Sequence, residues 1–189
     1  MINHVYIIAE AGVNHNGRLD LALQLCNAAK DAGADAVKFQ TWKTEKIVTR
    51  NAELAVYQEN NISDKTKSQF KMLKELELSY DNFEVVKNHC DEIGIQFLST
   101  PDEIDSLDFL CNFNLPFIKL GSGDVTNIPF LRLVGSRHID VVLSTGMSYL
   151  GDVEIAYRTL IEAGAKSVSL LHCTTVSYTH LTLPTNSRV

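Results

Sequence analysis

The sequence lacks several features that would place it in a specialised class of protein. Its first apolar run, Val5 to Ala9, spans five residues, which is too short for a membrane span or for the apolar core of a signal peptide. Its 17 lysines and arginines are scattered and are outnumbered by 23 acidic residues, so no surface for nucleic acid is predicted. We therefore expect a cytoplasmic protein that binds neither membranes nor nucleic acid and whose ligands are small.

Cysteine is also scarce, and its spacing shows no pairs. The four cysteines, Cys26, Cys90, Cys111 and Cys173, lie far apart, without the short intervals typical of zinc sites or redox-active pairs. We expect reduced thiols, most of them in the core. With 45% hydrophobic and 21% charged residues in 189, the composition is that of an ordinary globular domain.

What the sequence does contain is an unbroken alternation of short apolar runs and segments with helical spacing. Strands are predicted to begin at Tyr6, Ala36, Ile95, Phe117, Val141 and Val168. Helices are predicted at 20–32, 69–76, 80–93, 105–113, 129–136 and 153–163. Polar residues at the end of every strand favour an α/β fold of the TIM-type (β/α)8 barrel class over an open doubly wound sheet. The polar segment from Trp42 to Ser68 is predicted to be an irregular loop on the substrate side.

The number of strands predicts that this barrel is truncated after about the sixth strand. Eight βα units need about 250 residues, whereas the sixth strand already ends near Thr175. Residues 176–189 show neither helical period nor a bounded strand, and we interpret them as a non-native tail. We therefore expect one partial barrel domain over residues 1–175, with apolar side chains exposed on the unpaired first and sixth strands.

Two lysines lie inside predicted core strands, where an ammonium group is costly unless an anion meets it. Lys38 is in the second strand and Lys119 in the fourth. Lys119 is followed by Gly121-Ser122-Gly123-Asp124, in which the glycines leave backbone N–H groups open to a phosphate or carboxylate oxygen. A structural lysine paired with a carboxylate is the alternative, but the recurrence of the construction favours an anion-binding site.

Six motifs at the ends of the predicted strands are similar to motifs of a known protein family. They are Ile8-Ala-Glu10-Ala-Gly-Val-Asn14-His15-Asn-Gly17, Val37-Lys38-Phe-Gln40, Phe97-Leu-Ser-Thr100-Pro, Phe117-Ile-Lys119-Leu-Gly-Ser122-Gly-Asp124, Leu143-Ser144-Thr-Gly-Met147 and Leu171-His-Cys-Thr. Together they resemble the bacterial sialic acid synthase family, which contains N-acetylneuraminate synthases with their legionaminate and pseudaminate relatives. The resemblance implies condensation of phosphoenolpyruvate with N-acetylmannosamine, or a related N-acyl amino sugar, to a nine-carbon sialic acid with release of phosphate.

The resemblance also implies roles for eight residues. Those that match positions holding phosphoenolpyruvate are Lys38, Thr100, Lys119, Ser122 and Ser144. Gln40 and Asp124 match positions facing the sugar, although some members have glutamate in place of Asp124. Glu10 matches the catalytic acid/base. The chemistry agrees, since two ammonium groups with hydroxyl and backbone donors can neutralise a phosphate and a carboxylate, while Glu10 can move a proton.

A divalent metal (manganese or magnesium) and a homodimer are implied for full-length members of the family. Neither His15 nor His172 matches the family's metal-binding histidines, so no metal ligand is assigned. We expect His15 to be a turn histidine bonded to backbone and His172 to be a satisfied core histidine, with a site role as the alternative for each. We also expect the C-terminal antifreeze-like domain to be absent. The alternatives are therefore another phosphoenolpyruvate-condensing keto-sugar acid synthase, or an inactive fragment that retains only anion contacts.

Overall fold

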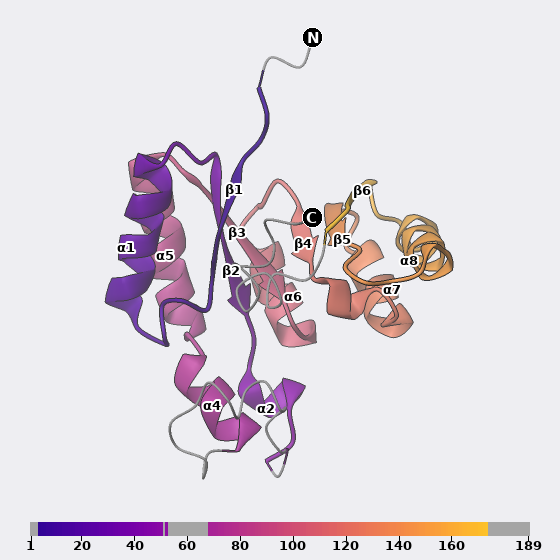
Figure 1. The fold of residues 1–189 in the computed structure, drawn as a ribbon, viewed down its shortest axis with the longest axis horizontal. Helices are drawn as coiled ribbons and strands as arrows, with labels where there is room; N and C mark the ends of the chain where they lie inside the picture. Colours follow the sequence, from indigo (N-terminus) through magenta and orange to yellow (C-terminus); the bar gives the residue numbers. More distant parts are fainter. Residues whose placement is uncertain (1–3, 51, 53–67, 174–189) are drawn as a thin grey trace, which may run out of the picture. The chain divides into compact units, whose positions relative to one another are not determined.

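The computed structural model describes residues 4–50, 52 and 68–173 (Figure 1). They belong to two compact units, Met1–Leu115 and Pro116–Val189, each with a sheet of parallel strands and helices packed on it. All six predicted strands are present, and helices alternate with them as predicted. None of the helices in the described part is both long and apolar enough to cross a bilayer. Thr175 and the predicted tail over residues 176–189 lie outside the described residues.

The first unit is built on a three-stranded parallel sheet in the order β1-β2-β3. The strands are β1 (Ile8–Gly12), β2 (Ala36–Thr41) and β3 (Gln96–Pro101). The register places Glu10 beside Lys38 and Gln40 beside Thr100. Since alternate residues of a strand point to the same face, Lys38 and Gln40 share one face of β2.

Two helices pack together on this unit, α1 (Leu19–Asp31) and α5 (Tyr80–Ile93), and lie side by side in Figure 1. As predicted, α5 begins after Ser79, whose hydroxyl accepts a hydrogen bond from Asn82 N–H, and ends at Gly94. Gly94 has φ 71°, a left-handed conformation that glycine adopts without strain. A further helix, α6 (Ile104–Cys111), packs on β3.

A short helix inside the predicted loop after β2 departs from the predicted elements. This helix, α2 (Thr44–Ile47), is too short to show helical periodicity, so the prediction that the segment is irregular is wrong here. It packs against α4 (Gln69–Leu76). Trp42, the single tryptophan, is buried beside it and donates from Nε1 to the Thr44 hydroxyl at 3.1 Å. Residues 51 and 53–67 of the predicted loop lie outside the described part.

The core of the first unit is aromatic on the side covered by helices. Phe39 of β2, Phe97 of β3 and Phe83 of α5 are buried, and their ring centroids are 5.9 to 6.3 Å apart. Because Phe39 lies between Lys38 and Gln40 in the strand, its contact with α5 places those two polar side chains on the opposite face.

The cysteines agree in part with the prediction of reduced core thiols. All four are free, as predicted. Cys26 of α1 and Cys90 of α5 are buried with their Sγ atoms 3.5 Å apart, whereas Cys111 and Cys173 are partly exposed. The prediction that most of the thiols lie in the core therefore holds for two of the four.

The second unit repeats the pattern with a parallel sheet in the order β4-β5-β6. Its strands are β4 (Ile118–Leu120), β5 (Asp140–Ser144) and β6 (Ser167–Leu171). A 3-10 turn, η1 (Ser122–Asp124), follows β4. Helices α7 (Ile128–Gly135) and α8 (Leu150–Ala163) pack closely at Gly135. A Cβ atom there would lie only 2.6 Å from the Leu160 carbonyl oxygen, so the absence of a side chain allows this contact.

The sixth strand and the residues just before the first strand expose apolar side chains, whereas β1 itself has no exposed apolar residue, so the prediction made from the truncated barrel holds for β6. Val5, Tyr6 and Ile7 are 71%, 48% and 52% exposed, and Leu170 and Leu171 of β6 are 43% and 39% exposed. β1 and β6 are edge strands of their sheets, so each has a ladder partner on one side only in the described structure.

The expectation that a buried strand begins at Tyr6 is wrong. The strand begins at Ile8, because Asp35 binds the backbone just before it. Asp35 Oδ2 accepts from Ile7 N–H at 2.6 Å, and the N–H groups of Asp35 and Ala36 donate to the Ile7 carbonyl.

Candidate active site

A buried lysine with three oxygen partners forms the first cluster, on the face of the β1-β2-β3 sheet opposite Phe39 and helix α5. Lys38 Nζ lies 3.0 Å from Glu10 Oε2, 3.3 Å from Thr100 Oγ1 and 3.4 Å from the Phe39 carbonyl oxygen. The Lys38 side chain is 7% exposed and that of Glu10 is 30% exposed. An ammonium group buried to this degree needs such partners, so the cluster is organised around its charge.

Two further residues complete the first cluster. Gly12 ends β1 with φ 53°, and a Cβ atom there would lie 3.2 Å from Glu10 Oε1, so a glycine leaves room for the carboxylate. Gln40 is partly exposed on the same face as Lys38 and pairs in register with Thr100. An amide next to an ammonium and a carboxylate can bind a polar ligand group.

Lys119 forms the second cluster, in the β4-β5-β6 sheet. Its Nζ donates to Ser144 Oγ at 2.7 Å and to the Leu120 carbonyl oxygen at 2.6 Å, and the residue is 7% exposed. Ser144 is the last residue of β5, the strand that pairs with β4. These two partners are neutral oxygens, and the Lys119 charge also acts on the carboxylate of Asp124 on the adjoining turn.

The turn after β4 is open, as the sequence predicts. A Cβ atom added at Gly121 or Gly123 would meet no atom within 4 Å. The first N–H groups of a 3-10 turn have no partner inside the turn and can bind an oxygen anion. Gly146, with φ 54°, lies against this turn. A Cβ atom at Gly146 would come within 2.6 Å of Ser122 Oγ, which shows how close the two residues are.

Asp124 closes η1 in a partly buried position. Its Oδ1 accepts from Asn127 Nδ2 at 3.3 Å. Burial raises the pKa of Asp124 above its ordinary value, against smaller opposing effects of the Asn127 hydrogen bond and the Lys119 charge. Asp124 therefore takes up a proton more readily than an exposed aspartate.

The two histidines singled out in the sequence differ in burial. His15 is fully buried and its Nδ1 accepts from Gly17 N–H at 3.0 Å, as expected of a turn histidine bonded to backbone. Burial lowers the pKa of His15, so its ring is held neutral. His172 is exposed, and the expectation of a core histidine is wrong because the residue follows the edge strand β6.

No group of three or more histidine, cysteine, aspartate or glutamate residues in the described part of the chain could hold a metal ion. The residues described here therefore do not supply a ligand set for the divalent metal that the resemblance implies.

The structure brings together two sets of predicted residues, each within one unit. The first set is Glu10, Lys38 and Thr100, and the second is Lys119 and Ser144. Gln40, Ser122 and Asp124 lie on the same face or on the adjoining turn. Sequence reasoning gave no role to Gly12 or Gly146, although a glycine directly after a strand that ends in functional groups is a signal for close backbone approach.

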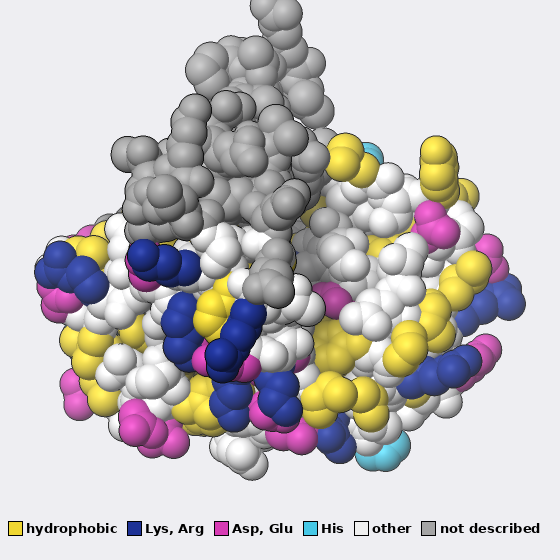
Figure 2. Space-filling model, turned by 90° about the horizontal axis from the view of Figure 1, so that it is seen from below, with side chains coloured by type: hydrophobic (Ala, Val, Ile, Leu, Met, Phe, Trp, Pro, Cys, Tyr) yellow, Lys and Arg dark blue, Asp and Glu magenta, His cyan; other side chains and the backbone are white. Residues whose placement is uncertain are grey.

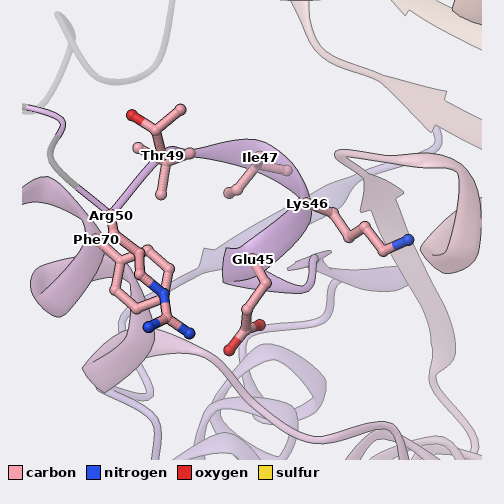
Figure 3. A pocket seen from close by; sticks show the side chains of 7 residues that line it. Glu45, Lys46, Ile47, Thr49, Arg50 and Phe70 are labelled. Atoms are coloured by element: carbon pink, nitrogen blue, oxygen red, sulfur yellow. The ribbon is translucent and has the colours of Figure 1, made fainter.

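A separate cavity of about 380 Å³ is lined by residues 45–50 and by Phe70 (Figure 3). None of the eight predicted site residues lines it. Charges around α2 and α4 are paired: Lys43 lies 3.3 Å from Asp105, and Lys74 lies 3.1 Å from Glu45. On the face shown in Figure 2, basic and acidic side chains are likewise intermixed. We therefore place the candidate functional residues at the two lysine clusters, one in each unit.

Comparison with known proteins identifies one protein family and several of its members. The model of the NeuB family matches residues 25–183. The N,N'-diacetyllegionaminic acid synthase of Legionella pneumophila is 43% identical over 173 residues, which cover 89% of this chain and 48% of that protein. The N-acetylneuraminate-9-phosphate synthase of Drosophila melanogaster is 36% identical, over 92% of this chain and 46% of that protein. The chain thus spans about half the length of these relatives.

A solved structure confirms the fold class. The N-acetylneuraminic acid synthetase of Leptospira borgpetersenii serovar Hardjo-bovis, crystallised in complex with citrate, matches with a TM-score of 0.74 and 30% identity. The match covers 91% of this chain and 55% of that one. Together with the repeated parallel βα units, it confirms the prediction of an α/β fold that forms part of a (β/α)8 barrel.

Proposed function

This chain belongs to the NeuB family, the sialic acid synthase family that its motifs predict, and we propose that it binds phosphoenolpyruvate for condensation with an N-acyl amino sugar. The product is a nine-carbon sugar acid of the sialic acid type, and phosphate is released. The observation that carries the proposal is the pair of buried lysines, each with a hydroxyl partner from the neighbouring strand. Each cluster can bind an anionic group such as a phosphate or a carboxylate.

The proposed roles follow from the chemistry of each side chain. As the resemblance implies, Lys38 and Thr100 are proposed to bind phosphoenolpyruvate, and Lys119, Ser144 and Ser122 match further positions that bind it. Gln40 and Asp124 are proposed to hydrogen-bond the sugar. Glu10 is the acid/base, because its carboxylate is partly exposed and lies next to Lys38. A homodimer in the cytoplasm is part of the same proposal, since the family resemblance implies it.

In the proposed reaction, the methylene carbon of phosphoenolpyruvate attacks the aldehyde carbon of the open-chain sugar, and Glu10 gives a proton to the aldehyde oxygen. Water adds to the cationic carbon that carries the phosphate ester, and the proton that this water loses restores Glu10. The resulting tetrahedral intermediate expels phosphate by cleavage of the carbon–oxygen bond, and its hydroxyl group becomes the ketone of the product as the hydroxyl proton leaves with the phosphate. A lysine that binds the phosphate stabilises the negative charge on the departing group, which lowers the barrier.

The acceptor sugar has two candidates. N-acetylmannosamine is the acceptor that the motifs predict first. The 43% identity to an N,N'-diacetyllegionaminic acid synthase, against 36% to an N-acetylneuraminate-9-phosphate synthase, favours an amino sugar with two N-acetyl groups as the second candidate. The two sugars differ by an amide group, which a hydrogen-bonding side chain can distinguish.

Binding and turnover test the proposal separately. Calorimetry should show phosphoenolpyruvate binding to this chain, with loss of binding in Lys38→Met and Lys119→Met and no change in Lys166→Met, an exposed lysine. Turnover is measured in a chimera in which residues 1–173 replace the matched segment of the Legionella pneumophila relative. Phosphate release should require both phosphoenolpyruvate and an unphosphorylated N-acyl amino sugar. Absence of binding and of release would refute the proposal, and release with a phosphorylated aldose alone would favour the other keto-sugar acid synthases.

A further inference from the structure

Lys38 has no N–H group to spare for a substrate. An ammonium group has three N–H donors, and Lys38 Nζ lies within 3.4 Å of three oxygens, those of Glu10, Thr100 and Phe39. An anion can therefore bind Lys38 only if it displaces or shares one of these partners. The Phe39 carbonyl belongs to the backbone of β2 and the Thr100 side chain is buried in β3, so neither can withdraw. Glu10, 30% exposed, is the partner that can move.

The exchange changes the charge around Glu10. Of the two elements packed against β1, β2 contributes one charged side chain, Lys38, in contact with Glu10. The buried residues of helix α1 are Ala22, Cys26 and Ala29, and Cys26 is the one with an ionisable side chain. The Cys26 thiol lies against Cys90 of α5, on the face of the sheet covered by helices. When a phosphate or carboxylate occupies Lys38, Glu10 loses its cation and gains an anionic neighbour. Both effects favour its protonated form.

We infer that the anionic substrate and Glu10 exchange at Lys38, and that anion binding is coupled to proton uptake at Glu10. The inference rests on the proposed function and assigns the order of events at the same site. Anion binding then prepares the general acid, because the proton that Glu10 gains is the one that it donates to the aldehyde oxygen. The proton lost by the attacking water restores the balance, so the cycle consumes no net proton at Glu10.

Calorimetry in two buffers of different ionisation enthalpy tests the inference on the 189-residue chain. Phosphoenolpyruvate is one probe, and sulfate, which has no ionisation of its own near neutral pH, is the second. Between pH 6 and 7 the wild type should take up roughly 0.3 proton or more per bound anion beyond the uptake of Glu10→Gln. Glu10→Gln should bind the anion at least as tightly, because no charged partner has to be displaced. Glu84→Gln, an exposed carboxylate on α5, should keep the wild-type uptake.

The outcomes separate the two claims. Absence of anion binding in the wild type overturns the proposed function and the inference together. Binding without excess proton uptake overturns the inference alone, since Glu10 would then have moved into solvent as a carboxylate. If Glu10→Gln does not fold, the wild type alone decides: its sulfate affinity should fall at least about twofold per pH unit from pH 6 to 8, and a flat profile overturns the inference.

Discussion

Two buried ammonium groups are the features of this molecule that its sequence makes most visible at the residue scale. The partners of Lys38 include a carboxylate, whereas the hydrogen bonds of Lys119 go to a serine hydroxyl and a backbone carbonyl. The Lys119 charge also acts on the partly buried carboxylate of Asp124, on the adjoining turn. The two lysines therefore hold different contacts, a direct ion pair at Lys38 and hydrogen bonds to neutral oxygens at Lys119.

We expect Lys119→Ala to weaken phosphoenolpyruvate binding by about ten- to a hundredfold, the loss of roughly 1.5 to 3 kcal/mol from a charge-assisted contact. The measurement is calorimetric titration of the 189-residue chain. Lys166→Ala serves as the matched control, because that side chain is exposed. An unchanged affinity in a folded Lys119→Ala protein would remove Lys119 from the anion-binding residues.

Asp124→Asn should stabilise the protein at neutral pH. Burial raises the pKa of Asp124, so the folded state binds its proton more tightly than the unfolded state does, and stability is lost as the pH rises through that pKa. Asparagine keeps the shape without the charge. Denaturant unfolding at pH 4, 5.5 and 7 should show a gain at pH 7 that shrinks toward pH 4. A gain that is the same at every pH would mean that ionisation of Asp124 is not the cause.

At the scale of the element, the sequence predicts what periodicity and terminators can reveal. The helix predicted from Tyr80 to Ile93 has these bounds in the structure; the sequence offers Ser79 or Asp81 as its cap, of which the structure uses Ser79, and Gly94 ends it. The four-residue helix α2 is not predicted, because its formation depends on tertiary contacts such as the hydrogen bond from Thr44 N–H to Glu77 Oε2 at 2.8 Å. Local pattern is sufficient for long elements and insufficient for short ones.

Gly146→Ala should destabilise the second unit by about 1 to 3 kcal/mol, the cost of a side chain in a left-handed conformation with a clash against Ser122. It should also weaken anion binding, since η1 must shift to relieve the clash. The control is Gly151→Ala in α8, where a Cβ atom meets nothing within 4 Å; it should stabilise by about 0.5 to 1 kcal/mol. Equal effects of the two substitutions, measured by chemical unfolding, would contradict the close approach at Gly146.

At the scale of the whole molecule, the sequence predicts the number and direction of the strands but only part of the candidate site. Strand ends identify Lys38, Thr100 and Ser144 as candidates, because parallel strands place their carboxyl ends together. That Glu10 is an ion-pair partner of Lys38 could not be predicted, since it depends on the register of β1 against β2 and on the turn at Gly12. Pairing between distant segments is set by packing, which no local pattern records.

The exposed edge strands predict self-association of this chain. Leu170→Lys, on β6, should lower aggregation while it changes the free energy of unfolding by no more than about 0.5 kcal/mol. Ile155→Lys provides the control, because Ile155 is 55% exposed but lies on helix α8 rather than on a strand. Light scattering during a thermal ramp measures the effect. If both substitutions suppress scattering equally, general hydrophobicity rather than edge pairing drives association.

The single tryptophan provides an intrinsic fluorescence probe at a known position in the molecule. Trp42 is buried in the first unit, where its indole N–H is bound to Thr44, and the sequence of the second unit contains no tryptophan. Emission excited selectively at the indole band therefore follows the environment of α2 alone, while far-ultraviolet circular dichroism follows the helices of both units. If the units melt separately, the two signals have different midpoints, and a ligand that acts only through Lys119 shifts the dichroism midpoint without moving the fluorescence one.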